Sequence, residues 1–286
     1  MNYNAYLNQQ GYSRSSQTSY NRQAELFKIW CKKQHTSPES IDYKTILKYI
    51  KYLTIQGNSK KTINHKLSSL KIHFNYLMEQ AYRVDNPLEQ LVIRGVVKTI
   101  HHNLLSSDEL EDLYYSYQGT TANKKRNKVI VGLLVYQGLS TTDLGNLKIE
   151  DLQLNKGKIY IPSTLRSNAR TLELKPWQIM EAIEYVNTVR PQLQKQFKNY
   201  SDQLFIINAR FTAITSNLAK ELKKQNQKFT NVKQLRASVI TLWLKHYNIR
   251  KVQHLAGHRY ISSTEKYKQD DLESLHEIIN TLHPIK

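Results

Sequence analysis

The stretch from Val232 to Tyr267 decides the fold prediction. It begins Val232-Lys233-Gln234-Leu235-Arg236-Ala237-Ser238, continues through an apolar helical run, and ends Leu255-Ala256-Gly257-His258-Arg259-Tyr260-Ile261-Ser262-Ser263-Thr264-Glu265-Lys266-Tyr267. Lys233 and Arg236 are three residues apart, so on a helix they project from one face. A histidine and, nine residues later, a tyrosine follow them. Two cations, an imidazole and a phenol form a set of groups suited to phosphoryl transfer onto a tyrosine.

Transfer of a DNA phosphodiester to a hydroxyl needs three things: an in-line nucleophile, neutralised charge on the phosphoryl oxygens and a protonated leaving oxygen. Arginine suits the second task because its planar fork binds two phosphate oxygens and keeps its charge. Histidine or lysine can donate a proton, and tyrosine, with an ordinary pKa of about 10, can attack when cations surround it. The scheme needs no metal or cofactor, and the sequence contains no acidic cluster spaced for Mg²⁺.

Each of these residues also has an ordinary structural explanation. Any one of 19 tyrosines is more often a packing or surface residue, and a Gly-His pair is usually a helix end. Arg236 alone can be a structural ion-pair partner. The functional interpretation therefore depends on the remainder of the chain.

The charge of the chain indicates a polyanionic partner. The formal net charge is +19 in 286 residues, and residues 1–102, with 15 Lys and Arg against 6 Asp and Glu, carry +9 of it, leaving +10 for the rest. Nucleic acid is the simplest such partner, because a membrane surface would require a basic amphipathic helix or a lipid anchor. Cys31 is the only cysteine, and the polar N-terminus lacks a signal peptide, so we expect a cytoplasmic protein.

Residues 1–94 are expected to form a small helical domain, in which residues 1–15 are poorly ordered and Leu88–Ile93 adds a short last helix. Its clearest apolar stripe follows a candidate N-cap at Ser59 and comprises Ile63, Leu67, Leu70, Phe74 and Leu77. The other faces of this helix are basic. The alternatives for these lysines are a solvated face and a DNA-binding surface, and the domain's charge favours DNA binding by Lys60, Lys61, Lys66 and Lys71.

Residues 95–104 are expected to be a linker, in which His101-His102 lies near phosphate rather than at a metal, and residues 105–286 a second, α-rich domain. Ser106 and Glu109 fit a capping box, and the Val129–Tyr136 run predicts a buried central helix. Two alternating segments, Lys158–Pro162 and Arg170–Leu174, predict a β-hairpin. Further helices are expected at 177–196, 213–226, 233–247 and Asp271–Leu282. The predicted fold class is mainly α with one small β-hairpin or sheet.

The order Lys233, Leu235-Arg236, Leu255-Ala256-Gly257-His258 and Tyr267 resembles the C-terminal signature of the tyrosine recombinase (phage integrase) family. The resemblance covers nearly the whole chain: residues 1–94 resemble the family's helical core-binding domain and residues 105–286 its catalytic domain, without the extra arm-binding domain of larger integrases. It implies a DNA integration or recombination enzyme that cleaves and rejoins strands of double-stranded DNA through a 3′-phosphotyrosyl intermediate. It also implies a homo-tetramer that holds two recombination sites, no cofactor, a cytoplasmic, nucleoid-associated location and a role in a mobile element.

The resemblance also implies residue roles. Tyr267 would be the nucleophile, Arg236 would clamp the scissile phosphate, and His258 would donate a hydrogen bond to it. Lys233 stands where the family usually has histidine.

Two departures define the open question. Ser140 stands where the family has its first arginine, and Leu165 where it has a hairpin lysine; losing one such donor costs about 10²–10³ in rate. Arg166, Arg170 or Lys175 can reach in from the hairpin, and Arg166 is nearest in register. The leading hypothesis is an active recombinase with a compensating cation, and the alternative is a recombinase-derived DNA-binding protein with weak or lost cleavage.

Overall fold

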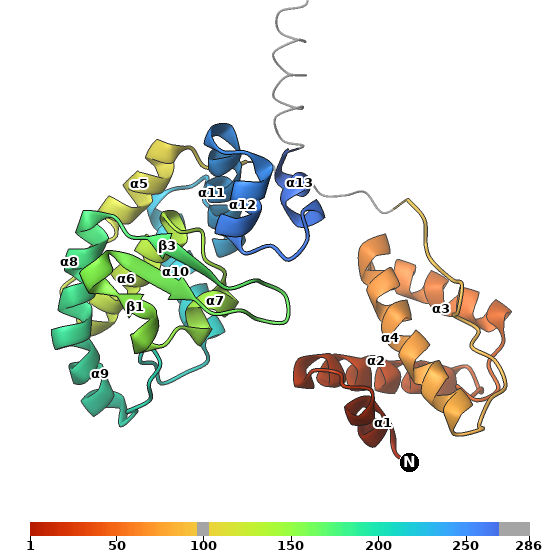
Figure 1. The fold of residues 1–286 in the computed structure, drawn as a ribbon. Coiled ribbons are helices and arrows are strands. Elements are labelled where there is room, and N and C mark those ends of the chain that lie inside the picture. The colour runs from red at the N-terminus through yellow and green to blue at the C-terminus, as the bar shows by residue number, and fades with distance from the viewer. Residues whose placement is uncertain (96–102, 269–286) are drawn as a thin grey trace, which may run out of the picture. The chain divides into compact units, whose positions relative to one another are not determined.

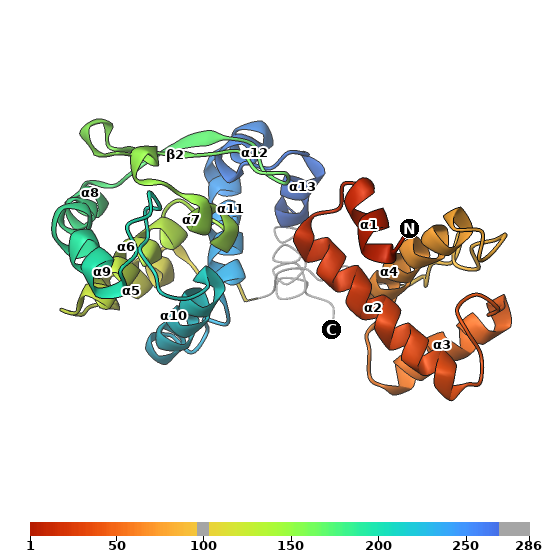
Figure 2. The same ribbon diagram turned by 90° about the horizontal axis from the view of Figure 1, so that it is seen from below.

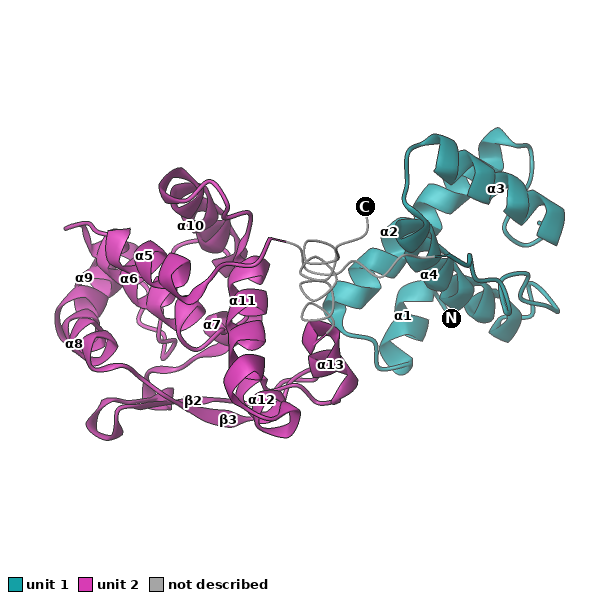
Figure 3. Ribbon diagram, turned by 90° about the horizontal axis from the view of Figure 1, so that it is seen from above, with its two compact units in different colours: residues 1–98 teal, residues 99–286 magenta. Residues whose placement is uncertain are grey.

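The computed structural model describes residues 1–95 and 103–268 (Figure 1). The chain divides into two compact units, residues 1–98 and 99–286 (Figure 3). Most of the predicted linker, including His101 and His102, and the predicted last helix, Asp271–Leu282, lie outside the described residues.

Unit 1 is built from helices, which are α1 (Tyr3–Gln9), α2 (Arg14–Lys33), α3 (Tyr43–Ile55) and α4 (Lys60–Glu79). The predicted N-cap of α4 is confirmed, because the Ser59 side chain accepts a hydrogen bond from the Thr62 amide. The predicted stripe is confirmed as well, since Ile63, Leu67, Leu70, Phe74 and Leu77 are all buried. They pack against α2 and α3 around Phe27, Trp30 and Tyr49.

Two expectations for unit 1 are wrong. Residues 1–15 include α1, which is capped by Asn2 and buries Tyr6 and Leu7. This short helix is ordered because it packs against aromatic rings on α4. Residues 88–93 form no helix. The Asn64 side chain instead holds that segment, bonding both the amide and the carbonyl of Ile93, so its polar backbone groups are satisfied without helical hydrogen bonds.

Unit 2 contains α5 (Ser107–Ser116), α6 (Ala122–Val135), α7 (Thr141–Asn146), α8 (Pro176–Glu184), α9 (Arg190–Phe197), α10 (Phe211–Gln225), α11 (Val232–His246), α12 (Ile249–Ala256) and α13 (Ser262–Lys268). A π-helical turn, Tyr185–Val189, joins α8 to α9. The predicted buried helix is confirmed, since Val129 to Val135 of α6 are all buried. The capping box of Ser106 and Glu109 is present at the start of α5.

The strands of unit 2 are β1 (Leu152–Gln153), β2 (Lys158–Ile161) and β3 (Arg170–Glu173), in an antiparallel sheet of that order. The predicted hairpin is the β2–β3 pair, with Ile159 opposite Leu172 and Ile161 opposite Arg170. Ile159 and Ile161 of β2 and Leu172 of β3 point into the core. Because side chains alternate along a strand, every second residue of β3 points the same way as Leu172. The hairpin extends to α12, and α11, α12 and α13 pack against one another (Figure 2).

Candidate phosphoryl-transfer site

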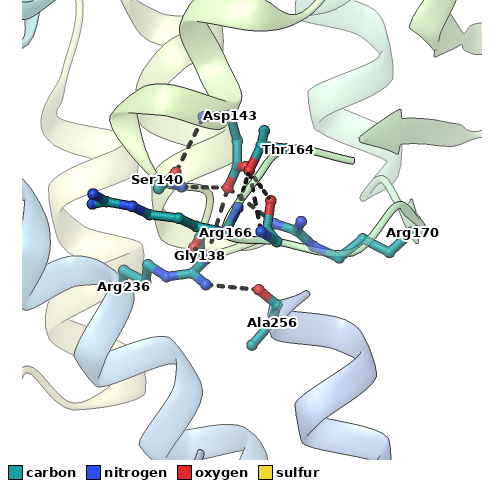
Figure 4. A network of polar contacts seen from close by, with 9 residues as sticks. Gly138, Ser140, Asp143, Thr164, Arg166, Arg170, Arg236 and Ala256 are labelled. Atoms are coloured by element: carbon teal, nitrogen blue, oxygen red, sulfur yellow. Dashed lines mark hydrogen bonds and ion pairs between the residues drawn. The ribbon is translucent and has the colours of Figure 1, made fainter. Parts of the chain in front are cut away.

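Arg236 connects three segments of unit 2. It lies in the second turn of α11, which begins at Val232. The N-cap residue Asn231 accepts a hydrogen bond from the Gln234 amide. The guanidinium donates from Nη1 to the carbonyl of Gly138 at 2.6 Å and from Nη2 to that of Ala256 at 2.7 Å (Figure 4). Its side chain is 16% exposed. Arg236 is therefore fixed in place, with a limited opening to solvent.

Ser140 caps α7. Its hydroxyl accepts from the Asp143 amide at 3.1 Å, and its own amide donates to Asp143 Oδ2 at 3.0 Å, which is a reciprocal capping box. The same carboxylate oxygen lies 3.1 Å from Nη2 of Arg170 and 4.0 Å from Nη1 of Arg236. Asp143 thus joins the two arginines to the position where the family pattern has its first arginine.

Arg170 approaches from the start of β3 and is 0% exposed. Its Nε and Nη1 have no hydrogen-bond partner among the residues that the structure describes. A Cβ at Gly257, where φ is +68°, would lie 2.3 Å from this Nη1. The guanidinium therefore lies directly against the backbone of the turn that precedes His258.

His258 and Tyr267 face each other across the α12–α13 turn. Their rings stack with centroids 5.9 Å apart and an interplanar angle of 9°. Nδ1 of His258 lies 2.9 Å from the Thr264 hydroxyl. When Thr264 donates this bond, the neutral imidazole carries its proton on Nε2 and can donate from there. Tyr267 is half-buried against Ile240, Val252 and Ala256.

Burial and the two arginines set the protonation states of the site. Burial, followed by the charges of Arg236 and Arg170, lowers the pKa of His258 to about 4, so the ring is neutral at pH 7. Burial raises the pKa of Tyr267 and the Arg236 charge offsets part of that rise. For Asp143, burial works against ionisation, but the Arg170 charge and the Ser140 hydrogen bonds prevail and lower its pKa.

The hairpin loop is attached to the turn that carries His258. Ser167 forms a β-bridge with His258, and the Asn168 amide donates to the carbonyl of Gly257 at 3.0 Å. From the other side, Nη1 of Arg259 donates to the carbonyl of Leu165 at 3.0 Å. The loop and the turn consequently hold each other in place.

The remaining predicted site residues lie at the surface. Lys233 on α11 and Arg166 in the hairpin loop are both exposed. Neither side chain has a hydrogen-bonding or ion-pair partner within residues 1–95 and 103–268. Leu165, at the family's lysine position, is 83% exposed. The structure therefore groups Arg236, His258 and Tyr267 with Asp143 and Arg170, and leaves Lys233 and Arg166 solvated.

The predicted DNA-binding lysines of α4 differ in their surroundings. Lys60 and Lys61 are exposed at the start of the helix. Lys66 lines a hollow of about 550 Å³ beside Trp30 and Tyr52. Lys71 donates to the backbone carbonyl of Glu89, so it also supports the segment after α4.

The described part of the chain, 1–95 and 103–268, holds no group of three or more His, Cys, Asp or Glu side chains arranged for a metal ion. Within the same residues, no helix combines the length and apolar character that crossing a bilayer requires.

Sequence reasoning missed Asp143 and Thr264. Asp143 follows Ser140 by three residues, which is the spacing of a capping box. The Ser140–Asp143 pair could therefore have been predicted from the sequence. Its second partner was not, because Arg170 lies 27 residues away on another element. Thr264 gave no signal beyond its place between the histidine and the tyrosine.

Comparison with known proteins matches both units. Residues 103–273 match the phage integrase family, and residues 1–81 match the phage integrase N-terminal SAM-like domain. Similar curated proteins include the tyrosine recombinase XerC of Thermodesulfovibrio yellowstonii, 26% identical over 97% of this chain and 93% of that protein. The tyrosine recombinase XerD of Listeria monocytogenes is 24% identical over 96% of this chain and 95% of its own length.

Solved structures show the same fold at low identity. The XerH site-specific recombinase in a post-cleavage complex with difH has a TM-score of 0.67 at 20% identity, covering 88% of this chain and 75% of that one. The Tn1549 transposon integrase with right-end DNA has a TM-score of 0.65 at 18% identity over 97% of both chains. The fold is thus one shared with DNA recombinases. The chain belongs to the phage integrase family.

Proposed function

We propose that this protein is a site-specific tyrosine recombinase that cleaves and rejoins DNA strands through a 3′-phosphotyrosyl intermediate on Tyr267. The observation that carries the proposal is the stacking of His258 on Tyr267 beside a fixed Arg236. The relatives named XerC and XerD, similar along nearly their full lengths, support it.

In the proposed reaction, the Tyr267 oxygen attacks the scissile phosphorus, and the bond from phosphorus to the 5′ oxygen breaks. The phenol loses its proton, the tyrosyl ester forms at the 3′ phosphate, and the 5′ hydroxyl leaves after gaining a proton. Arg236 neutralises charge on the phosphoryl oxygens, and neutral His258 donates a hydrogen bond to one of them. Lys233, exposed on the first turn of α11, is a candidate proton donor for the leaving oxygen.

The two units divide the task. Unit 1, which matches the SAM-like domain, binds double-stranded DNA through α4, where Lys60 and Lys61 are exposed. Unit 2 contains the chemistry. A homo-tetramer that pairs two recombination sites, a cytoplasmic and nucleoid-associated location and a role in a mobile element complete the proposal.

The test is covalent capture. A duplex site is selected from a random-sequence library by the full-length protein and nicked at successive positions. When the nick lies just 3′ of the scissile phosphate, cleavage releases a short fragment that carries the leaving 5′ hydroxyl, so the strand cannot be rejoined. We expect a protein–DNA adduct that withstands denaturation, and its loss in Tyr267→Phe. Tyr260→Phe is the matched control, because Tyr260 lies in the same region, is 68% exposed and has no assigned role.

The alternative is a DNA-binding protein that has lost cleavage, and Ser140 is the observation that favours it. It predicts salt-sensitive binding to the selected site with no adduct at any nick position. An adduct that survives Tyr267→Phe would contradict the assignment of the nucleophile.

A further inference from the structure

Asp143, Arg170 and Arg236 form a buried ionic cluster with unbalanced charge. One carboxylate lies within ion-pair distance of two guanidiniums, at 3.1 Å and 4.0 Å. The side chains of Arg170 and Asp143 are 0% and 4% exposed, so water contributes little to balancing them. These three residues carry a net charge of +1. Burying an unpaired charge is unfavourable unless a further anion pairs with it.

The unsatisfied hydrogen-bond donors of this cluster are on Arg170. Arg236 uses two of its donors on backbone carbonyls. Arg170 donates only from Nη2, to Asp143, and its Nε and Nη1 have no acceptors among the described residues. A fully buried guanidinium normally has its donors satisfied, so Arg170 is not explained as a structural ion pair alone.

Arg170 is directed at the catalytic turn. Its Nη1 lies where a side chain at position 257 would begin, and the turn accommodates it only because that residue is glycine. Burial lowers the pKa of His258 and of Arg236, and the charge of Arg170 adds to the lowering of both. Its field therefore reaches both groups that we assign to the scissile phosphate.

We propose that Arg170 supplies from β3 the second guanidinium charge of the phosphate site, the charge that Ser140 does not carry. Because the side chain is buried, it acts through the low-dielectric interior and as a positioning residue for Arg236, not by contact with DNA. Asp143 holds it in place without cancelling both arginines. This inference rests on the proposed strand cleavage at the same site.

The experiment compares two scissile linkages in the selected nicked duplex, a phosphodiester and a methylphosphonate, which lacks the negative charge. Single-turnover adduct formation is measured for the full-length wild type, Arg170→Met and Arg170→Lys. We expect Arg170→Met to slow cleavage of the phosphodiester about 10–100-fold, less than the about 10²–10³ of a donor in contact. Arg170→Lys, which keeps the charge, should lose less than Arg170→Met. On the methylphosphonate, the gap between wild type and Arg170→Met should close to about threefold.

A purely structural role gives a different pattern. Arg170→Met would then be slowed relative to wild type by the same factor on both linkages, and that result overturns the proposal. Unchanged cleavage of the phosphodiester by Arg170→Met overturns it as well. If wild type forms no adduct on any duplex, the proposed function itself fails, so the two failures are distinguishable.

A second variant protects the test against misfolding of Arg170→Met. Ser140→Arg in the otherwise wild-type chain should change adduct formation less than about tenfold, since the charge is already present. A gain of about 10² or more would mean that the site lacked a second guanidinium and would contradict the proposal. Where Arg170→Met folds, adding Ser140→Arg to it should restore most of the lost rate.

Discussion

Arg236 is the residue at which the described part of the site converges. It joins the turn after α6 to the end of α12 through two carbonyls and lies 4.0 Å from Asp143. A guanidinium can make these contacts at once because its donors form a planar fork, whereas an ammonium concentrates its charge at one point. Because these contacts already fix the guanidinium, Arg236 can bind a phosphate without moving its side chain.

Arg236→Lys keeps the charge but cannot reach both carbonyls. We expect adduct formation to fall about 10²-fold and the free energy of unfolding to fall by about 1–3 kcal/mol, the cost of buried acceptors left unpaired. Single-turnover cleavage and urea denaturation measure the two effects. Arg250→Lys on the exposed face of α12 is the control and should match wild type; a wild-type rate in Arg236→Lys would contradict the assigned role.

His73 is a buried histidine of unit 1 whose pKa is strongly lowered. It is 1% exposed in unit 1, both ring nitrogens lack partners among the described residues, and Tyr3 of α1 packs edge-on against it. Burial, aided by the charge of Lys28, lowers its pKa from 6.5 to about 4. The unfolded chain therefore binds a proton between pH 6.5 and 4 that the folded chain does not, and stability falls as the pH falls through this window.

Protonation of this histidine in the unfolded chain lowers the free energy of unfolding by about 2 kcal/mol at pH 5 relative to pH 7. His73→Phe should abolish this part of the pH dependence, as measured by urea denaturation of the full-length protein at both pH values. His65→Phe, at an exposed position of the same helix, should retain it. An unchanged pH dependence in His73→Phe would rule out His73 as the source.

At the scale of elements, the hairpin and the α12–α13 turn act as one unit. The bridge from Ser167 to His258 and the bond from Arg259 to Leu165 join them from both sides. Gly257 allows this approach because Arg170 occupies the space where a Cβ would project. A displacement of the hairpin therefore moves the backbone that carries His258.

Gly257→Ala tests this coupling. The new methyl would meet Arg170 at 2.3 Å in a backbone with φ of +68°, so we expect a loss of about 2–4 kcal/mol in stability and a drop in cleavage. Gly157→Ala has a similar φ of +61°, but meets only the end of Ile179 at 3.3 Å and should cost about 1 kcal/mol with normal cleavage. Equal effects of the two substitutions would contradict the coupling.

The elements that the sequence predicted well are those with a local signal. The α4 stripe repeats with helical period, and the Ser106–Glu109 box spans one helical turn, so both were readable. Helix α1 was missed because its burial depends on rings of α4, some 70 residues away in sequence. The Arg170–Asp143 pair was missed for the same reason: side-chain pairing between a strand and a helix leaves no periodic trace. Arg236, His258 and Tyr267 were singled out by the order of their motifs along the chain.

At the scale of the whole molecule, positive charge is present in both units. Unit 1 carries 15 basic against 6 acidic residues, and the chain carries +19. Neutralising phosphates with lysine and arginine releases counterions, so affinity for DNA should fall steeply with salt. Charge of this kind supplies affinity for any duplex, and does not by itself select a site.

The Lys60→Gln/Lys61→Gln double variant tests the DNA-facing assignment of α4. Removing two phosphate contacts should make the slope of log affinity against log salt shallower by about 2, on selected and random duplexes alike. Titrations at several salt concentrations measure this slope. Lys195→Gln/Lys198→Gln, at the end of α9, is the control and should leave the slope unchanged; equal changes in both variants would argue against α4 as the DNA surface.

If Tyr267 is the nucleophile, it becomes joined to the 3′ end of a cut strand, and that bond can be identified chemically. The adduct formed by the wild-type protein is digested with nuclease and with a protease that cleaves after glutamate, which separates Tyr260 from Tyr267 at Glu265. Mass spectrometry of the peptide then locates the nucleotide. We predict a 3′-nucleotide on Tyr267, and a nucleotide on another residue, or one joined through its 5′ phosphate, would contradict the account.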